Sequence, residues 1–319
     1  MIGVREIRAV AERIARHVVR TPTVPSPGLS SLLNAPVTVK LELLQRTGSF
    51  KARGATARLL ALSEAERAAG VVAVSGGNHG IALAVMAAAL DVKATVVMPR
   101  SASTRAAEIV ESSGASLRLT DDMAGAFALM TRLRAEGLTL VHPFDDPLVI
   151  AGQGTVGLEF AEDAGELTDV LVSIGGGGLI SGVAAALRAL RPGVRIWGVE
   201  TEGAQAMSEA LATGGPVPVP LSSIVTTLSA PAVSQLTYDH VSALVDEVLV
   251  VPDREAVRGT LDLADHAKVW AEPAAGCLLP AARRVLERVG DEARLGLVLC
   301  GGNATTGDVM SWAERFDLR

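Results

Sequence analysis

Short runs of β-branched and other apolar residues alternate with longer stretches rich in Ala and Leu from residue 37 onward. Strands that are apolar on both faces are typical of parallel sheets covered by helices. The alternation therefore predicts the α/β class, with open, mostly parallel sheets covered by helices. The expected strands are Val37–Leu41, Val71–Val74, Ala94–Met98, Ser116–Leu119, Thr139–Val141, Val170–Ile174, Arg195–Val199, Glu247–Val251 and Gly296–Cys300. The expected helices include His79–Leu90, Ala151–Ala164, Leu179–Leu190 and Asp253–His266.

The number of expected strands exceeds what one sheet comfortably holds, so we expect two α/β domains with a cleft between them. Residues 214–220, Gly-Gly-Pro-Val-Pro-Val-Pro, predict a connecting loop. Ligands in open α/β sheets gather where strands end and helices begin. Four unusual strand-to-helix turns, at residues 46–51, 75–80, 175–178 and 301–303, are therefore the candidate site.

Charge and composition narrow the classes of partner. The chain has 29 Lys and Arg against 35 Asp and Glu, a formal net charge of −6, without a long basic run, which argues against nucleic acid. Residues 170–187 carry no charge, but four consecutive glycines make a strand, loop and helix a better interpretation than a membrane span. Residues 1–20 read as an amphipathic helix, not a signal core. The two cysteines, Cys277 and Cys300, predict neither a disulfide framework nor a zinc site and fit a reducing cytoplasm.

Four consecutive glycines at residues 175–178 follow an apolar strand and open a helix. Their N–H groups could surround a phosphate at the positive end of that helix. A dinucleotide fingerprint is an alternative because Glu200 closes the next strand, but its last glycine would fall on Ile180 or Ser181. A nucleotide P-loop also fails, since no Gly-Lys-Ser/Thr follows. From this motif alone, phosphate binding and a plain tight turn both remain open.

Lys51 lies in the segment Thr47-Gly48-Ser49-Phe50-Lys51-Ala52-Arg53-Gly54-Ala55, in the expected first turn of a helix capped by Gly48 or Ser49. The positive end of the helix dipole lowers the pKa of an amine, as imine formation requires. A solvated surface lysine is the commoner alternative.

The two other turns are weaker signals when taken singly. Ser75-Gly76-Gly77-Asn78-His79-Gly80 offers short polar groups and free N–H donors to a carboxylate or a ring hydroxyl, or is an ordinary turn capped by Asn78. Cys300-Gly301-Gly302-Asn303 is, by itself, a buried thiol beside a turn.

Taken together and in this order, these four segments resemble the β-family (fold type II, tryptophan synthase β-like) of pyridoxal-phosphate enzymes, and specifically its serine/threonine dehydratase and serine racemase branch. The branch's Ser-Phe-Lys-x-Arg-Gly-Ala segment matches residues 49–55, whereas related sulfhydrylases and cystathionine synthases usually have Ser-Val-Lys-Asp. The resemblance continues through Ile150-Ala151-Gly152-Gln153-Gly154-Thr155 and Glu272-Pro273 and so covers nearly the whole chain.

The resemblance implies that pyridoxal 5'-phosphate is the cofactor and that Lys51 carries it as a Schiff base and acts as the catalytic base. By the same likeness, Phe50 packs on the cofactor ring, Asn78 reaches the ring hydroxyl and Cys300 faces the pyridine nitrogen. The implied cofactor-binding set is Phe50, Lys51, Asn78, Gly175, Gly176, Gly177, Gly178, Leu179 and Cys300, and the implied substrate-binding set is Ser75, Gly76, Gly77 and His79.

The resemblance also implies an organisation and a reaction. A large domain would comprise residues 1–67 and 147–319, a small inserted domain residues 68–146, and the protein would be a homodimer. The implied reaction eliminates the β-hydroxyl of L-serine or L-threonine and yields a 2-oxo acid and ammonia. A thiol at Cys300 cannot supply negative charge to the pyridine nitrogen, so the ring would be a moderate electron sink that favours elimination.

Three departures from the branch qualify the expectation. Ser229-Ala230 stands where many relatives have Asp-Gly, and Ala206 stands where some have a second metal-binding carboxylate, so no metal site is predicted. A regulatory C-terminal domain is not expected. In the racemases, a serine that returns a proton to Cα corresponds to Gly76. A serine racemase or hydroxyaspartate ammonia-lyase on the same scaffold, and a non-catalytic cofactor-binding regulatory module, remain the alternatives.

Overall fold

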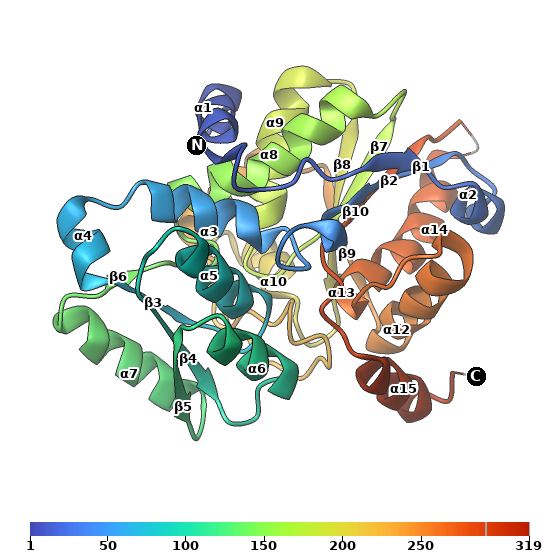
Figure 1. Ribbon diagram of the computed structural model, residues 1–319. Helices are drawn as coiled ribbons and strands as arrows, with labels where there is room; N and C mark the ends of the chain where they lie inside the picture. The colour runs from blue at the N-terminus through green and yellow to red at the C-terminus, as the bar shows by residue number, and fades with distance from the viewer. Residues whose placement is uncertain (291, 319) are drawn as a thin grey trace.

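The computed structural model describes residues 1–290 and 292–318. Two sheets with helices on their faces confirm the α/β class (Figure 1). The strands are β1 (Thr23–Pro25), β2 (Val37–Leu41), β3 (Val71–Val74), β4 (Ala94–Pro99), β5 (Ser116–Thr120), β6 (Thr139–Leu140), β7 (Asp169–Ser173), β8 (Arg195–Thr201), β9 (Glu247–Val251) and β10 (Leu295–Leu299). The α-helices are α1 (Val4–Ile14), α2 (Pro27–Leu33), α3 (Lys51–Leu60), α4 (Glu64–Ala69), α5 (Asn78–Ala89), α6 (Thr104–Ser112), α7 (Met123–Ala135), α8 (Pro147–Asp163), α9 (Gly178–Leu190), α10 (Ala206–Thr213), α11 (Gln235–Leu244), α12 (Asp253–Asp262), α13 (Pro273–Gly276), α14 (Leu278–Val289) and α15 (Thr306–Arg315). A short 3-10 turn (Glu42–Leu44) follows β2, and a π-helical turn (Leu263–Ala267) extends α12.

The larger sheet has six strands in the order β1-β2-β10-β7-β8-β9. The last strand of the chain, β10, lies between β2 and β7 and pairs in parallel with both, so that Leu297 faces Val39 on one side and Leu171 on the other. In Figure 1, α8 and α9 cover one face of this sheet, and α12, α13 and α14 cover the other. This burial on both faces explains why the central strands are almost continuously apolar.

The smaller sheet has four parallel strands in the order β5-β4-β3-β6. All of them lie between residues 71 and 140, and the sheet stands apart from the larger one in Figure 1. The proposed domain boundaries, residues 1–67 and 147–319 against 68–146, stay a prediction.

Every strand expected from the sequence is present, with ends that differ by at most two residues. The additional strand β1 pairs antiparallel with β2 at the edge of the larger sheet. It is three residues long and ends on Pro25, which is tolerated at an edge because proline has no N–H to donate. Such a segment has too little pattern for recognition from sequence.

Helix α8 begins four residues earlier than expected, because Asp146-Pro147 forms its start. The Asp146 carboxylate accepts hydrogen bonds from the N–H groups of Leu148 and Val149, and Pro147 occupies the first turn. Helices α8 and α9 approach so closely that a Cβ added at Gly182 would collide with the backbone at Gly154. This close packing places α9, and the glycine turn before it, firmly against the larger sheet.

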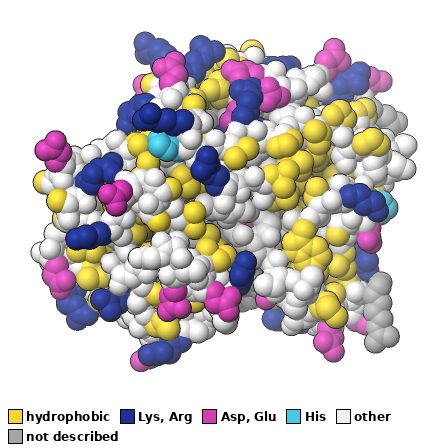
Figure 2. All heavy atoms as spheres, viewed as in Figure 1, with side chains coloured by type: hydrophobic (Ala, Val, Ile, Leu, Met, Phe, Trp, Pro, Cys, Tyr) yellow, Lys and Arg dark blue, Asp and Glu magenta, His cyan; other side chains and the backbone are white. Residues whose placement is uncertain are grey.

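The surface in Figure 2 shows Lys and Arg side chains interspersed with Asp and Glu over that face, without a continuous basic band among the residues drawn in colour. Within residues 1–290 and 292–318, no helix is both long and apolar enough to cross a membrane.

Candidate active site

Three of the four unusual turns follow strands that are neighbours in the larger sheet. The Lys51 segment comes after β2, the Cys300 segment after β10 and the glycines after β7. Because these strands are parallel, their carboxyl ends meet at one edge of the sheet. The site is therefore built from segments that are far apart in the sequence.

Lys51 is the first residue of α3, and Phe50 is the residue that precedes the helix. The expectation that Gly48 or Ser49 caps the helix is wrong, because both are engaged in a short antiparallel bridge with the residues after β10. Ser49 pairs with Gly301, and the Phe50 N–H donates to the Cys300 carbonyl at 3.0 Å. The C-terminal turn thereby holds the start of α3.

The Lys51 side chain is half-buried and lies over its own neighbour. Its Nζ is 5.1 Å from the centre of the Phe50 ring and donates a hydrogen bond to the Pro143 carbonyl at 2.9 Å. Burial of the ammonium lowers the pKa of Lys51 to about 8, and the Cys300 sulfur opposes only part of this shift. A useful fraction of the side chain is therefore free amine near neutral pH.

Cys300 follows the last residue of β10 and is buried. Its Sγ accepts a hydrogen bond from the Ser173 hydroxyl at 3.4 Å. Burial, followed by the negative charge of Glu272, raises the pKa of Cys300 to about 12. The sulfur is therefore a neutral thiol at physiological pH.

Asn78, the first residue of α5, links the smaller sheet to the larger one. Its Nδ2 donates to Glu272 Oε1 at 2.7 Å, and its Oδ1 accepts from Asn303 Nδ2 at 2.7 Å. Asn78 does not cap the helix with its side chain, because Gly77 precedes it. Burial raises the pKa of Glu272 to about 7, and the hydrogen bond from Asn78 offsets part of this rise. Glu272 is part of the matched Glu272-Pro273 segment, but its pairing with Asn78 was not expected.

Residues 175–178 form the turn between β7 and α9. Gly177 adopts the left-handed conformation with φ +90°, which glycine reaches without the steric penalty of a side chain. Since Gly177 has no side chain, the N–H groups of Gly178 and Leu179 at the helix start lack a side-chain cap. The arrangement presents backbone donors and the positive end of the α9 dipole to an anion.

Phe144 closes one side of this turn, a feature that sequence reasoning missed. A Cβ added at Gly176 would collide with the Phe144 ring, and one at Gly178 would lie 2.9 Å from Phe144 Cβ. The residue before it is Pro143, the hydrogen-bond partner of Lys51. No motif marks this segment, although its position directly after a strand of the smaller sheet could have suggested it.

The expected substrate-binding residues lie at the end of β3. Ser75 and Gly76 are half-buried, and the Gly77 N–H donates to the Ser75 hydroxyl at 3.3 Å. His79 is buried, and its Nε2 lies 2.8 Å from the Val141 carbonyl. Burial, and then the charge of Lys51, lowers the pKa of His79 to about 3, so the ring is neutral.

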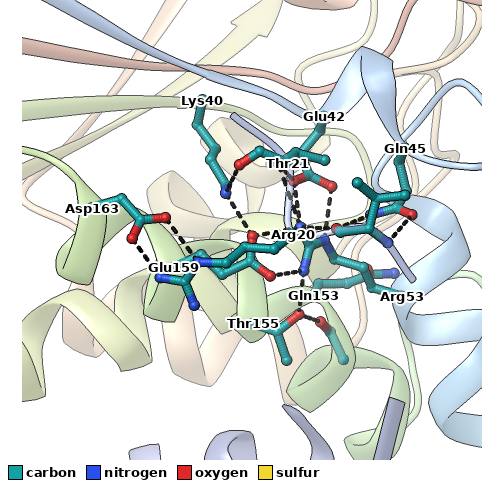
Figure 3. Close-up of polar contacts among 12 residues, drawn as sticks. Arg20, Thr21, Lys40, Glu42, Gln45, Arg53, Gln153, Thr155, Glu159 and Asp163 are labelled. Atoms are coloured by element: carbon teal, nitrogen blue, oxygen red, sulfur yellow. Dashed lines mark hydrogen bonds and ion pairs between the residues drawn. The ribbon is translucent and has the colours of Figure 1, made fainter. Parts of the chain in front are cut away.

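A buried cluster of charged residues surrounds Arg53, which follows Lys51 in α3 (Figure 3). Arg53, two residues along α3, donates to both oxygens of Glu42 and both oxygens of Glu159 over 2.6–2.8 Å. Lys40 on β2 donates to Glu159 at 2.6 Å. Burial would raise the pKa of Glu159, but the hydrogen bonds and charges of Arg53 and Lys40 outweigh it, and the net pKa is lowered. The cluster joins α3, β2 and α8.

Glu200, the residue that suggested a dinucleotide site as an alternative, is hydrogen-bonded within the protein. Its carboxylate accepts from the N–H groups of Met207 and Ser208 and from the Ser208 hydroxyl, at 2.7–2.9 Å. It therefore caps the start of α10 and is buried. Among residues 1–290 and 292–318, no group of three or more His, Cys, Asp or Glu side chains is arranged to hold a metal.

The fold and the site define a class: an open α/β protein in which a lysine of lowered pKa and an uncapped helix start follow strands of the same sheet, on either side of β10. The family described as "Pyridoxal-phosphate dependent enzyme" matches residues 14–301, and the chain belongs to it. A phenylserine dehydratase from Ralstonia pickettii is 38% identical over 314 residues, which cover 98% of this chain and 95% of that protein. An L-threonine ammonia-lyase from Thermotoga maritima is 37% identical, covering 95% and 76% respectively. The structure of maize serine racemase is 33% identical, with a TM-score of 0.91 and coverage of 99% and 97%.

Pyridoxal phosphate is accordingly the cofactor, and the donor set fits its chemistry. An amine of lowered pKa suits the aldehyde, an uncapped helix start suits the phosphate, and a neutral thiol offers no charge to the ring nitrogen. The fold type II assignment made from the motifs is confirmed by the family and by the solved relatives.

Proposed function

We propose that the protein is a dehydratase, or ammonia-lyase, that converts L-threonine, L-serine or both to a 2-oxo acid and ammonia. The observation that carries the proposal is a site with one amine of lowered pKa, Lys51, and no side chain at Gly76. The similar dehydratase and ammonia-lyase, matched over almost the whole chain, support the same reaction class.

In the proposed site, Lys51 holds the cofactor covalently, Gly175–Gly178 and Leu179 bind the phosphate, Phe50 packs on the ring and Cys300 faces the ring nitrogen. Asn78 donates to the ring oxygen. Ser75, Gly76, Gly77 and His79 bind the substrate, whose carboxylate is suited to the N–H groups at the start of α5.

The cofactor, when bound, withdraws electrons from the substrate Cα. Lys51 Nζ, once released from the cofactor, accepts the Cα proton, and its pKa near 8 suits both this step and the return of a proton. The β-hydroxyl then takes up one proton and leaves as water, which leaves an enamine between Cα and Cβ. The released enamine gains a proton at Cβ and becomes an imine. Water adds to the imine at C2 and the nitrogen leaves as ammonia, so the net change is amino acid to 2-oxo acid and ammonia.

Gly76 favours elimination over racemisation. A racemase needs a second acid on the opposite face of the ring from the lysine. A Cβ built at Gly76 would lie 2.6 Å from the Ala102 Cβ, so the surrounding structure is packed for a glycine there. Racemisation is the second candidate function because maize serine racemase shares the fold over nearly the full chain.

A 2-oxo acid assay across β-substituted amino acids tests the proposal. The panel is L-threonine, L-serine, phenylserine and 3-hydroxyaspartate, with the Lys51→Ala variant as the inactive control. We expect turnover of at least one of the first two. Cofactor binding without turnover of any amino acid would instead support a non-catalytic binding module.

We further propose a homodimer in a reducing cytoplasm, with residues 68–146 moving as a unit against the rest of the chain. Two buried free thiols, Cys277 and Cys300, suit a reducing compartment. Sedimentation analysis tests the dimer. Limited proteolysis with and without substrate tests the two-domain division, because cleavage should concentrate near residues 67 and 146.

A further inference from the structure

We propose that Asn303 and Glu272 are positioning residues that fix the amide orientation of Asn78, so that an N–H donor and not a carbonyl faces the ring oxygen of the cofactor. The proposal rests on the proposed contact between Asn78 and that oxygen. Neither positioning residue needs to touch the cofactor.

A backbone carbonyl fixes the orientation of the Asn303 amide. Asn303 Nδ2 lies 2.8 Å from the Thr47 carbonyl oxygen, which can only accept a hydrogen bond. The opposite amide orientation would bring two oxygens together. Gly48 makes room for this side chain, since a Cβ there would collide with Asn303 Oδ1 and its φ of +70° suits glycine. Thr47 therefore determines which way the Asn303 amide points.

Asn303 in turn fixes the orientation of the Asn78 amide. The second hydrogen on Asn303 Nδ2 is donated to Asn78 at 2.7 Å, so the atom that faces Asn303 must be the acceptor, Oδ1. The Asn78 Nδ2 is then directed to Glu272 Oε1, at 2.7 Å. Glu272 is itself held by backbone pairing, because its N–H donates to the Gly301 carbonyl.

This arrangement leaves one N–H of Asn78 without a protein acceptor among residues 1–290 and 292–318. Asn78 is only 7% exposed, and a buried donor without a partner is costly. An ionised ring oxygen accepts from such a donor and is stabilised by it. If the amide were reversed, a carbonyl oxygen would repel the same group.

The test is a double-mutant cycle without added charge: Asn303→Ala, Glu272→Gln and both together, with Asn78→Ala as the reference. In Asn303→Ala, the Glu272 carboxylate still requires N–H from Asn78 above about pH 7, where it is ionised. In Glu272→Gln, Asn303 still imposes the orientation and the glutamine supplies its oxygen. With both changes, a glutamine that can donate or accept leaves the amide free to reverse.

The readouts are the pH titration of the ring oxygen, followed by the absorbance of the bound cofactor, the dissociation constant of the cofactor and the urea unfolding of the apoprotein. Cys300, with a pKa of about 12, and His79, with a pKa of about 3, do not titrate between pH 5 and 9. Glu272 has a pKa of about 7 and would contribute to the titration. The proteins with and without the Asn303→Ala change are therefore each compared with and without the Glu272→Gln change.

We expect the double variant to raise the apparent pKa of the ring oxygen by about one unit beyond the sum of the single changes and to weaken cofactor binding by about tenfold beyond that sum. The two changes should couple more weakly in apoprotein stability than in cofactor binding, because the ring oxygen is absent from the apoprotein. Additive spectral and binding effects, or an unshifted titration in the double variant, would overturn the proposal. A wild-type titration in Asn78→Ala would remove its premise, whereas the dehydratase assay stands or falls separately.

Discussion

The Nζ of Lys51 donates a hydrogen bond to the carbonyl oxygen of Pro143 at 2.9 Å. Lys51 begins helix α3, which comes after strand β2 of the larger sheet. Pro143 comes shortly after β6, a strand of the smaller sheet. The next residue, Phe144, packs against the glycine turn. One short segment therefore contacts both the lysine and the proposed phosphate site, and it connects the two sheets where the cofactor would lie.

Replacement of Lys51 by alanine should abolish turnover and the visible absorbance of the bound cofactor, because no other amine lies at the start of α3. The chain has three other lysines, Lys40, Lys93 and Lys268. Exposed Lys93→Ala is the matched control and should behave like the wild type. Borohydride reduction followed by peptide mapping should label Lys51 alone; a label on Lys40 or Lys268 would show that the assignment is wrong.

Replacement of Gly177 by alanine should weaken cofactor binding and also destabilise the apoprotein. The left-handed conformation costs a non-glycine residue roughly 1–2 kcal/mol, and the added Cβ would lie 2.8 Å from the Thr237 Cβ. Loss of one charge-assisted hydrogen bond corresponds to roughly a tenfold higher dissociation constant.

The control is Gly215→Ala, where the added Cβ meets nothing within 4 Å. Gly176→Val should also lose the cofactor, but its collision with Phe144 means that the fold will not remain unaffected. Wild-type cofactor retention in both glycine variants would contradict the phosphate role.

The rate at which the apoprotein captures pyridoxal phosphate should rise by about tenfold per pH unit below 8 and level off above it. The rate rises with pH because only the deprotonated amine reacts. Burial lowers the pKa of Lys51 to about 8, so deprotonation is complete at a lower pH than for a free lysine. Stopped-flow absorbance measures the rate. The same reaction with Nα-acetyl-lysine corrects for ionisation of the cofactor; a plateau shared by both amines would refute the lowered pKa.

Replacement of Arg53 by methionine should destabilise the apoprotein by about 3–5 kcal/mol at pH 8, because Glu42 would remain buried without its cationic partner and Glu159 would keep only Lys40. The loss should be smaller at pH 5, since uncompensated buried carboxyls have raised pKa values and take up protons there. Urea unfolding at the two pH values checks this. Arg20→Met, which breaks an exposed ion pair with Asp163, should cost less than about 1 kcal/mol at either pH.

The unmodified protein should form little or no D-serine from L-serine, as chiral chromatography can measure. Serine at position 76 should introduce a trace of racemisation, but the structure shows that Gly76→Ser alone would press on Ala102. The double change Gly76→Ser with Ala102→Gly gives the hydroxyl room, and Ala102→Gly alone is the control. Substantial D-serine from the unmodified protein would show that another residue serves as the second acid.

The candidate site was predictable where chemistry and local pattern coincide. Lys51, Gly175–Gly178 and Cys300 lie at strand ends in recognisable segments, and the structure brings these segments to one edge of the larger sheet. Pro143, Phe144 and the pairing of Glu272 with Asn78 were not predicted, because their roles depend on contacts between residues far apart in the sequence. Lys51 and Pro143 are 92 positions apart, Asn78 and Glu272 are 194 apart, and Phe144 contacts Gly176 in another part of the chain.

The sequence by itself determined the α/β class, the positions of the strands and the turns that carry the chemistry, because burial on both faces and helix starts leave local patterns. Only the tertiary structure decided that β10 inserts between β2 and β7, that Arg53 joins Glu42 to Glu159, and that Ala102 limits the space at Gly76. The physical reason is that an apolar residue must be buried and a buried charge must be paired, but several other residues of the chain could provide that contact. The choice among them is made by packing of the whole chain.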